Sequence, residues 1–536
     1  MFTQQEKKIL KQYFTNCDED VFCLINLPEV VKGTLFSRYS RSAKDLRRLF
    51  LDEFYQQEAL QNALPNNKSF SQTSVNLQKA ENFYERILIG YGDDSVAELG
   101  GAHLAVENIS VLASKSLEEH RIGLSPLEKS SRYVYFDSKV NGDYLFYKPK
   151  KILSSKFAAL YLKTTRLLFD TYSQIVRQIQ PYLKEIYPGD EKDLAYKFSI
   201  RAKACDLARG LLPLSAFTNL GIYGNGRAFE YLLIHLFNDP LEEVKEKAIK
   251  INEQLKKVLP AFIKRATNER GEKYRQYLNL SQSKLDQELK NLPMGKNGLK
   301  IKKPIVTLVD WEKNAIEKII AFLIFENTSF SLPQALKLAK KLSPRKKEAI
   351  IKAAVFGREN RHHKVRRAFE APYFTFEVLA DWGVYKDLMR HRLLTRHRQL
   401  FTNELGYFIP EEIKNTPFAN LFKKASDAAV EAYCKIKKEF PIEAQYLVIH
   451  AAYNRFLLKL NLREAVHLCE LRSSPQGHPS YREIAQKIAQ EIIKKYPLFA
   501  SVLKFVDYQK YHLERLSSFQ KILKKAEKLK VEVFKD

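Results

Sequence analysis

The chain has 536 residues, of which 45% are hydrophobic and 28% are charged. This balance excludes a disordered chain, and the length exceeds what one hydrophobic core usually fills, so two domains of ordinary size are expected. With 89 Lys and Arg against 62 Asp and Glu, the net charge of +27 favours a partner that carries phosphate, either a nucleotide or a nucleic acid, unless it is only a solvated basic surface.

The N-terminal segment and the cysteines bear on the compartment. The start MFTQQEKKILKQYF lacks the apolar core of a secretory signal, and no apolar run approaches the roughly 20 residues of a membrane span. The five cysteines lack metal-ligand spacing and an even disulfide framework, so they are interpreted as small buried hydrophobes: Cys17, Cys23, Cys205, Cys434 and Cys469. A cytoplasmic protein without a metal site or membrane contact is expected.

Most elements expected along the chain are helices. Alternating aromatic or β-branched residues predict strands over 131–136, 304–310 and 373–378. Apolar positions at three- and four-residue spacing predict helices over 211–236, 311–325, 444–471 and 484–505. The sequence therefore predicts a helix-dominated α+β fold with small sheets.

A linker divides the chain near its middle. A polar, helix-like stretch over 269–290 leads into the Pro and Gly punctuation of 291–299. The expected organisation is a first domain over 1–268, a helical linker over 269–299 and a second domain over 300–536.

The two sides of this linker carry similar motifs in the same order, which indicates an internal repeat. The first half has Glu119-His120-Arg121 and later Asn225-Gly-Arg227, whereas the second has Arg390-His391-Arg392 and later Asn461-Leu-Arg463. In each half a His-Arg pair, expected on a helix, precedes an Asn-x-Arg on a later helix.

The second-half motif begins a strongly basic segment. Arg390-His391-Arg392 and Arg396-His397-Arg398 lie six residues apart, and taken alone they are equally typical of a basic helix that follows nucleic-acid phosphates. Upstream, however, stands Phe374-Thr-Phe376. An aromatic-Thr-aromatic strand followed at this interval by Arg-His-Arg resembles the flavin-dependent thymidylate synthases.

Each half keeps only part of the family's motif residues. In that family the signature continues through a Ser, an Asn-Glu pair and Ser-x-Arg-Tyr, and later elements carry an Arg four residues before a Pro, an Asn-x-Arg and a final Leu-Arg. The first half keeps Glu128, Ser130-Ser131-Arg132-Tyr133, Arg209, Pro213, Asn225 and Arg227, but has Glu119 and Leu236 at the first and final Arg. The second half keeps Arg390, Asn461, Arg463, His467 and Leu471-Arg472, but has Leu400, Thr402 and Gln445 where a Ser and two Arg are usual.

Members of this family are homotetramers in which two facing subunits build each nucleotide site. The resemblance therefore implies two repeated domains, each a small antiparallel sheet flanked by helices, that form a pseudo-dimer in a monomeric or homodimeric particle. The implied dUMP-binding residues are Glu128, Ser130, Ser131, Arg132, Arg209, Arg390 and Arg472, of which Arg390 and Arg472 are also catalytic. The implied FAD-binding residues are His391, Arg392, Asn461, Arg463 and His467.

The implied activity is the reductive methylation of dUMP to dTMP. NADPH would reduce FAD, methylenetetrahydrofolate would give its one-carbon unit, and the reduced flavin would supply the hydride, so the cofactor carries the difficult step. The basic run over 361–367 is interpreted either as a further phosphate contact or as a capping or solvated segment.

Three departures from the family pattern leave rival functions open. Asp387 stands where Gln is usual, Glu119 replaces an Arg, and one residue is inserted before Ser130. A carboxylate such as Asp387 repels a phosphomonoester unless it is paired with Arg390 or protonated. The main rival is a non-catalytic flavin- or nucleotide-binding homologue. A basic nucleic-acid-binding protein is disfavoured, because no RNP or zinc-finger spacing is present.

Overall fold

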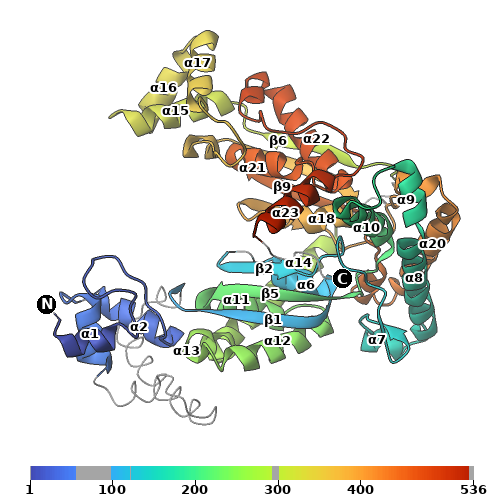
Figure 1. The fold of residues 1–536 in the computed structure, drawn as a ribbon, viewed down its shortest axis with the longest axis horizontal. Helices are drawn as coiled ribbons and strands as arrows, with labels where there is room; N and C mark the ends of the chain where they lie inside the picture. The colour runs from blue at the N-terminus through green and yellow to red at the C-terminus, as the bar shows by residue number, and fades with distance from the viewer. Residues whose placement is uncertain (1, 41, 56–97, 121, 293–300, 530–536) are drawn as a thin grey trace. The chain divides into compact units, whose positions relative to one another are not determined.

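The computed structural model describes residues 2–40, 42–55, 98–120, 122–292 and 301–529 (Figure 1). The chain divides into two compact units: unit 1 comprises Met1–Lys129 and Thr218–Gly295, and unit 2 comprises Ser130–Phe217 and Lys296–Asp536. Residues 130–217 of the first half therefore belong to the same unit as the second half. These units are defined by contacts in space, whereas the expected domains 1–268 and 300–536 are defined by the sequence repeat. The domain boundaries therefore stay a prediction.

Each unit contains a small sheet with the same order of elements. In unit 1 these are β1 (Gly101–Ser110), α6 (Val111–Glu118), β2 (Leu124–Glu128), β5 (Phe217–Asn225, in this unit from Thr218 on) and α11 (Gly226–Phe237), with sheet order β1-β5-β2. In unit 2 they are β7 (Tyr373–Asp381), α18 (Trp382–Leu388), β8 (Leu394–Arg398), β9 (Tyr453–Asn461) and α21 (Leu462–Arg472), and β6 (Ile305–Trp311) extends the sheet to the order β6-β7-β9-β8. The predicted helix-dominated fold with two repeated antiparallel sheets is confirmed.

The remaining elements are mainly helices. Unit 1 adds α1 (Gln4–Leu10), α2 (Glu29–Tyr39), α3 (Leu46–Leu49), α12 (Glu242–Leu255), α13 (Pro260–Ile263) and α14 (Glu269–Lys290). Unit 2 adds β3 (Lys139–Val140), β4 (Asp143–Tyr144), α7 (Lys150–Leu153), α8 (Ala158–Gln178), α9 (Gln180–Ile186), α10 (Leu194–Ala208), α15 (Ala315–Asn327), α16 (Leu332–Lys341), α17 (Pro344–Ala354), α19 (Glu411–Lys414), α20 (Phe418–Ile436), α22 (Pro479–Lys495) and α23 (Leu516–Leu529). Across the described segments we find no helix with the length and apolarity that a membrane crossing needs.

Two of the expected long helices are wrong. Residues 211–236 contain strand β5 before helix α11, and 444–471 contain strand β9 before helix α21. Along both strands buried and outward residues alternate, as at Phe456, Leu458 and Leu460 of β9, and this two-residue period defines a strand. Each helix begins only where an Asn side chain accepts a backbone N–H: Asn225 from Ala228 at 2.8 Å and Asn461 from Glu464 at 2.9 Å.

Other expected boundaries also shift. Trp311 ends strand β6, so the helix expected from 311 begins at Ala315, and the helix expected over 484–505 ends at Lys495, just before Pro497. The predicted strands over 304–310 and 373–378 are present as β6 and β7, and the helix expected over 269–290 is α14. Among the cysteines expected to be buried, Cys23 is exposed and Cys434 is half-buried.

The strand expected over 131–136 is absent, and a turn stands in its place. The backbone N–H of Arg132 donates to Ser130 Oγ at 3.2 Å, and that of Val134 donates to the Ser130 carbonyl at 3.1 Å. These local bonds compete with strand pairing. The basic segment over 390–398 is likewise no helix, because α18 ends at Leu388 and residues 394–398 form β8 beside β9. The expectation that the second-half His391-Arg392 pair lies on a helix is wrong.

Equivalent segments of the two halves pair within unit 2. Pro213 and Ile449, which follow Arg209 and Gln445 by four positions each, form an antiparallel bridge. Around it, the N–H of Leu214 donates to the Val448 carbonyl at 2.8 Å, and the N–H of His450 donates to the Leu212 carbonyl at 3.0 Å. A contact between equivalent residues is the mark of a two-fold interface, so the segments meet as those of a dimer do. Close by, α8 of the first half packs along α20 of the second (Figure 1).

Candidate nucleotide and flavin site

The four predicted nucleotide-site arginines all act electrostatically on one carboxylate in unit 2, that of Asp387. They are Arg132 in the turn after β2, Arg209 directly after α10, Arg390 after α18, and Arg472 at the end of α21. Burial raises the pKa of the Asp387 carboxyl, but the charges of these arginines outweigh it and hold that pKa below its ordinary value. The charges of two arginines from each half therefore keep Asp387 ionised and offset its negative charge.

Arg132 is held by a buried carboxylate from the first half. Its Nε and Nη2 donate to the two Asp206 oxygens, each at 2.9 Å, and Arg515 Nη2 donates to the same carboxylate at 2.6 Å. Burial opposes ionisation of Asp206, but Arg132 and Arg515 keep its pKa well below the ordinary range. The planar fork of Arg132 is thus fixed in direction, and its Nη1 donates to Tyr481 Oη at 3.2 Å.

Tyr481, on α22, lies beside arginines of both halves. The guanidinium carbon of Arg132 is 5.7 Å from the centre of the Tyr481 ring, and that of Arg472 is 5.6 Å from it. Both distances are within the range of cation–π attraction. Arg132 of the first half and Arg472 of the second therefore lie beside the same ring, as a nucleotide site built from both halves requires.

Arg209 is buried at the N-terminal end of α18, with 5% of its surface exposed. A Cβ on Gly383 would come within 3.2 Å of Arg209 Nη2, so the glycine allows this close approach. Burial raises the pKa of Asp381 to about 6 against the charge of Arg209, and burial together with Arg209 holds the pKa of His478 well below its ordinary value. Arg209 donates no hydrogen bond to any group in the described part of the chain, so its donors are available to a ligand.

His391 connects Arg472 to a second region of the site. Arg472 Nε donates to His391 Nε2 at 3.0 Å, and His391 Nδ1 lies 2.7 Å from Glu464 Oε1. Since Nε2 accepts a hydrogen bond, the ring proton belongs on Nδ1, which donates to the carboxylate. The ring is 4% exposed, and both of its nitrogens are bonded within the protein.

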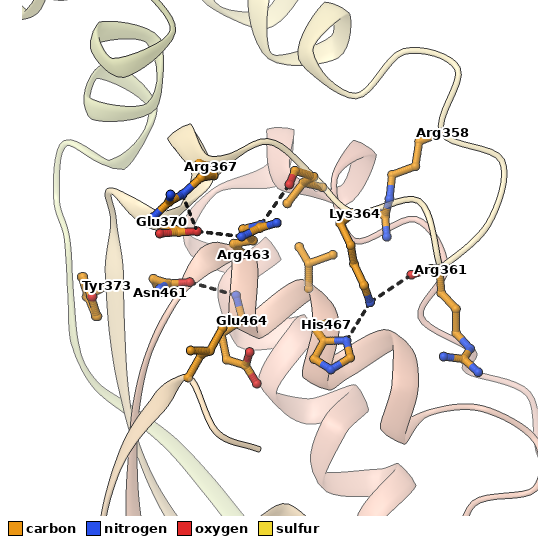
Figure 2. A pocket seen from close by; sticks show the side chains of 13 residues that line it. Arg358, Arg361, Lys364, Arg367, Glu370, Tyr373, Asn461, Arg463, Glu464 and His467 are labelled. Carbon is orange, nitrogen blue, oxygen red and sulfur yellow. Dashed lines mark hydrogen bonds and ion pairs between the residues drawn. The ribbon is translucent and has the colours of Figure 1, made fainter. Parts of the chain in front are cut away.

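A cavity of about 700 Å³ opens beside this group (Figure 2). Of the predicted FAD-binding residues, Asn461, Arg463 and His467 line it, whereas His391 and Arg392 do not. Arg463 is oriented by the Val365 carbonyl at 3.0 Å and by Glu370 at 2.7 Å. Burial lowers the pKa of His467 to about 4, so its imidazole is neutral at pH 7.

The wall of this cavity is strongly basic. Figure 2 shows Arg361, Lys364 and Arg367 of the run over 361–367 on the rim, and Lys364 Nζ lies 2.9 Å from His467 Nδ1. Arg358 also lines the cavity, but its guanidinium is committed to Glu470, with Nη1 at 2.8 Å from Oε1. The side-chain geometry favours the phosphate-contact interpretation of the run over a capping role.

The other predicted residues are placed as follows. Ser131 is buried and Ser130 half-buried in the turn that holds Arg132. Glu128 lies in unit 1 at the end of β2, where its carboxylate accepts from Lys115 Nζ at 2.9 Å, so its contact with dUMP stays a prediction. Arg121 lies outside the described residues.

The residue inserted ahead of Ser130 does not disturb the strand. Leu124 follows His120 by four positions, whereas Leu394 follows His391 by three. Leu124 nevertheless pairs with Gly224 and Leu394 with Leu460, and each of these partners directly precedes the Asn that caps the next helix. Gly123, with φ of 77°, lies in the longer turn. Sequence reasoning missed four partners of the site: Asp206, Glu464, Tyr481 and Arg515. No motif marks them, because they are defined by contacts across elements.

Comparison with known proteins identifies the family of this chain. The family model described as thymidylate synthase complementing protein matches residues 35–261 and 307–498. The chain belongs to this family. It is the flavin-dependent family that the motifs resemble, and the two separate matches confirm a tandem long form. The arginines of the cluster, two in each match, all lie inside the matched regions, whereas Arg515 lies beyond them.

Two relatives match this chain along nearly their whole length. A UPF0159 protein of Chlamydia muridarum is 43% identical over 520 residues, which are 96% of this chain and 97% of the relative. Another of Thermoplasma acidophilum is 33% identical and covers 91% of this chain and 97% of the relative. A UMP/dUMP methylase from Streptomyces cacaoi, solved with 5-Br dUMP, is 17% identical, with a TM-score of 0.31 over 39% of this chain and 98% of its own. A likeness at that TM-score carries no structural argument.

Proposed function

We propose that this tandem family member is a flavin-dependent thymidylate synthase that converts dUMP to dTMP with methylenetetrahydrofolate and NADPH, through FAD. The observation that carries the proposal is the arginine cluster: the charges of Arg132 and Arg209 of the first half and of Arg390 and Arg472 of the second all act on Asp387, and Arg132 and Arg472 lie beside the same Tyr481 ring. Neither half alone has this set. A degenerate binding protein has no reason to retain complementary parts of one site on both halves.

The cluster suits a nucleotide monophosphate. A phosphate carries nearly two negative charges, and arginine pairs with its oxygens through a planar fork. Arg209, whose donors are available, is our candidate for the phosphate together with Ser130 and Arg132. Arg390 and Arg472, on the half that carries the flavin cavity, would stabilise negative charge that develops on the pyrimidine ring.

The cavity suits FAD. Its volume of about 700 Å³ lies in the range of cofactor sites, and Arg361, Lys364, Arg367 and Arg463 supply the positive charge that a pyrophosphate needs. The cap of α21 adds the positive end of a helix dipole at Asn461. When bound, FAD would carry the hydride from NADPH to the one-carbon unit on the pyrimidine. Glu370 and the neutral His467 would orient the neighbouring cationic side chains and the flavin ring.

The direct test is product formation. Purified protein is incubated anaerobically with dUMP, methylenetetrahydrofolate, NADPH and FAD, and dTMP is measured by mass spectrometry, with each component omitted in turn. Formation of dTMP that requires FAD supports the proposal. Binding of FAD and dUMP without dTMP identifies the non-catalytic homologue. Binding of neither, with tight and salt-dependent binding of nucleic acid, identifies the third candidate function.

The flavin assignment has a matched pair of variants. Asn461→Ala and Asn225→Ala each remove one helix cap, which costs about 1 kcal/mol of stability in either case. Only Asn461 lines the cavity, so only N461A is expected to weaken FAD binding, as measured by flavin absorbance after gel filtration. Equal loss of flavin from both variants would contradict the assignment.

A further inference from the structure

Glu464 occupies an unusual place between the two parts of the site. It lies in the first turn of α21, is 4% exposed, and lines the cavity with Asn461 and His467. Its carboxylate nevertheless faces away from the basic rim, toward His391, whose Nδ1 lies 2.7 Å from Oε1. None of the motifs that identify the family includes this residue.

A chain of contacts leads from Glu464 to the nucleotide site. His391 Nε2 accepts from Arg472 Nε at 3.0 Å, and Arg472 lies against Tyr481, whose hydroxyl accepts from Arg132. Arg472 donates no other hydrogen bond within the described residues. Its two Nη groups are therefore available, while its Nε is fixed by the imidazole.

We propose that Glu464 is a positioning residue that acts through His391 to hold Arg472 in the orientation that binds the nucleotide; this rests on the proposed function. The carboxylate can only accept, so it keeps the proton of His391 on Nδ1 and leaves Nε2 as an acceptor for Arg472. A glutamine at 464 can donate its amide N–H to Nδ1 instead. The ring proton would then move to Nε2, where it opposes the N–H of Arg472.

The same arrangement couples the cavity to the nucleotide site. Glu464 lines the cavity and its carboxylate contacts His391, so a ligand that fills the cavity lies beside the residue that holds Arg472. If this ligand changes the affinity for the nucleotide, the nucleotide changes the affinity for the ligand by the same factor.

The first test is a double-mutant cycle on dUMP binding, measured by calorimetry on the full chain. Glu464→Gln is expected to weaken dUMP binding about tenfold, the size of one lost charge-assisted hydrogen bond. In an Arg472→Ala background the same substitution is expected to change it by less than about twofold, because its effect passes through Arg472. Glu464→Asp, which keeps the charge, should recover part of the affinity.

Glu377→Gln is the matched control. It removes a carboxylate from strand β7 of the same unit, but this one lies outside the cavity and pairs with Arg455 rather than His391. Its dUMP affinity should stay within about twofold of wild type. Equal affinity of E464Q and wild type, or additive effects of E464Q and R472A, would overturn the positioning role while leaving the proposed function standing.

A second measurement does not depend on any ligand. In protein labelled with ¹⁵N-histidine, the His391 resonances are identified by their loss in His391→Gln. The wild type should show a neutral ring protonated on Nδ1, and E464Q should lose that pattern. An Nε2-protonated ring in the wild type would overturn the inference. Failure of the wild type to bind dUMP, with the expected tautomer present, would instead overturn the proposed function.

Discussion

At the residue scale, carboxylates make the arginine cluster possible. Four guanidinium groups brought together would repel one another, but Asp387 and Asp206 are ionised among them and offset that repulsion. The family's usual Gln at 387 has no charge. A phosphate that enters this site brings further negative charge near Asp387, so the binding energy measured for dUMP is the attraction to the arginines less this repulsion.

Arg132→Ala tests the phosphate cradle. We expect dUMP binding to weaken about tenfold to a hundredfold, because a charge-assisted hydrogen bond to phosphate is lost, while FAD binding changes far less. The melting temperature should also fall, since among the described residues Asp206 would keep only Arg515 as an ion-pair partner. Arg166→Ala is the control: Arg166 lies in unit 2 but pairs with Asp143 on the surface. Unchanged dUMP affinity in R132A, measured by calorimetry, would reduce Arg132 to a structural role.

His467 predicts a pH dependence of stability. Its pKa falls from 6.5 to about 4, chiefly through burial, with Lys364 and His391 opposing its charge and Glu464 favouring it. Between these values only the unfolded chain takes up the proton, so stability is present above about pH 6.5 and is lost as the pH falls toward 4. Urea unfolding at pH 7 and pH 5 should show a loss about 1–2 kcal/mol larger in wild type than in His467→Gln. Asp381 titrates in the opposite sense, but it is present in both proteins. Its contribution therefore cancels when the loss of stability in His467→Gln is subtracted from that in wild type.

At the scale of elements, the strand–helix junctions carry the site. Asp381 caps α18 and Asn461 caps α21, so Arg390, His391 and Arg472 follow from two helices that start at adjacent strands of one sheet. The sequence predicted the motif residues and the second-half strands over 304–310 and 373–378, which are present as β6 and β7. It did not predict β5 and β9, because their apolar residues also fit a helical spacing and only pairing with neighbours decides between the two periods. Tyr481 and Asp206 were not predicted for a similar reason, because their partners lie tens or hundreds of residues away in the sequence.

Gly383→Ala tests the junction at α18. The added Cβ would lie 3.2 Å from Arg209 Nη2 and 3.0 Å from Asp381 Oδ1, and the flexible arginine can yield to it. Because alanine favours a helix more than glycine does, stability should be nearly unchanged, whereas the displaced Arg209 should bind dUMP about tenfold more weakly. Gly221→Ala, where a Cβ meets nothing within 4 Å, is the control for binding. Unchanged dUMP affinity with G383A would show that Arg209 does not bind the phosphate.

At the scale of the molecule, the duplication lets the two halves diverge. The Pro213–Ile449 bridge joins equivalent segments, so the Arg209 side and the Gln445 side of this interface would be identical in a homodimer. Here Arg209 keeps its donors available, whereas Gln445 is buried and accepts the N–H of Phe401 at 3.0 Å. One fused chain can keep one site and use the mirrored positions for packing, which two identical subunits cannot do.

This asymmetry predicts one nucleotide per chain. Calorimetric titration of the purified protein with dUMP should saturate at one equivalent per chain, and Arg132→Ala should weaken that single event rather than half of the signal. The mirrored position has lost its charge: the backbone N–H of Thr402 donates to Asn454 Oδ1 at 2.8 Å, and its hydroxyl lies 3.2 Å from Glu404. Thr402→Ala should therefore leave dUMP binding and dTMP formation within about twofold of wild type. Two equivalents per chain, or equal losses from T402A and R132A, would show that both mirrored sites bind the nucleotide.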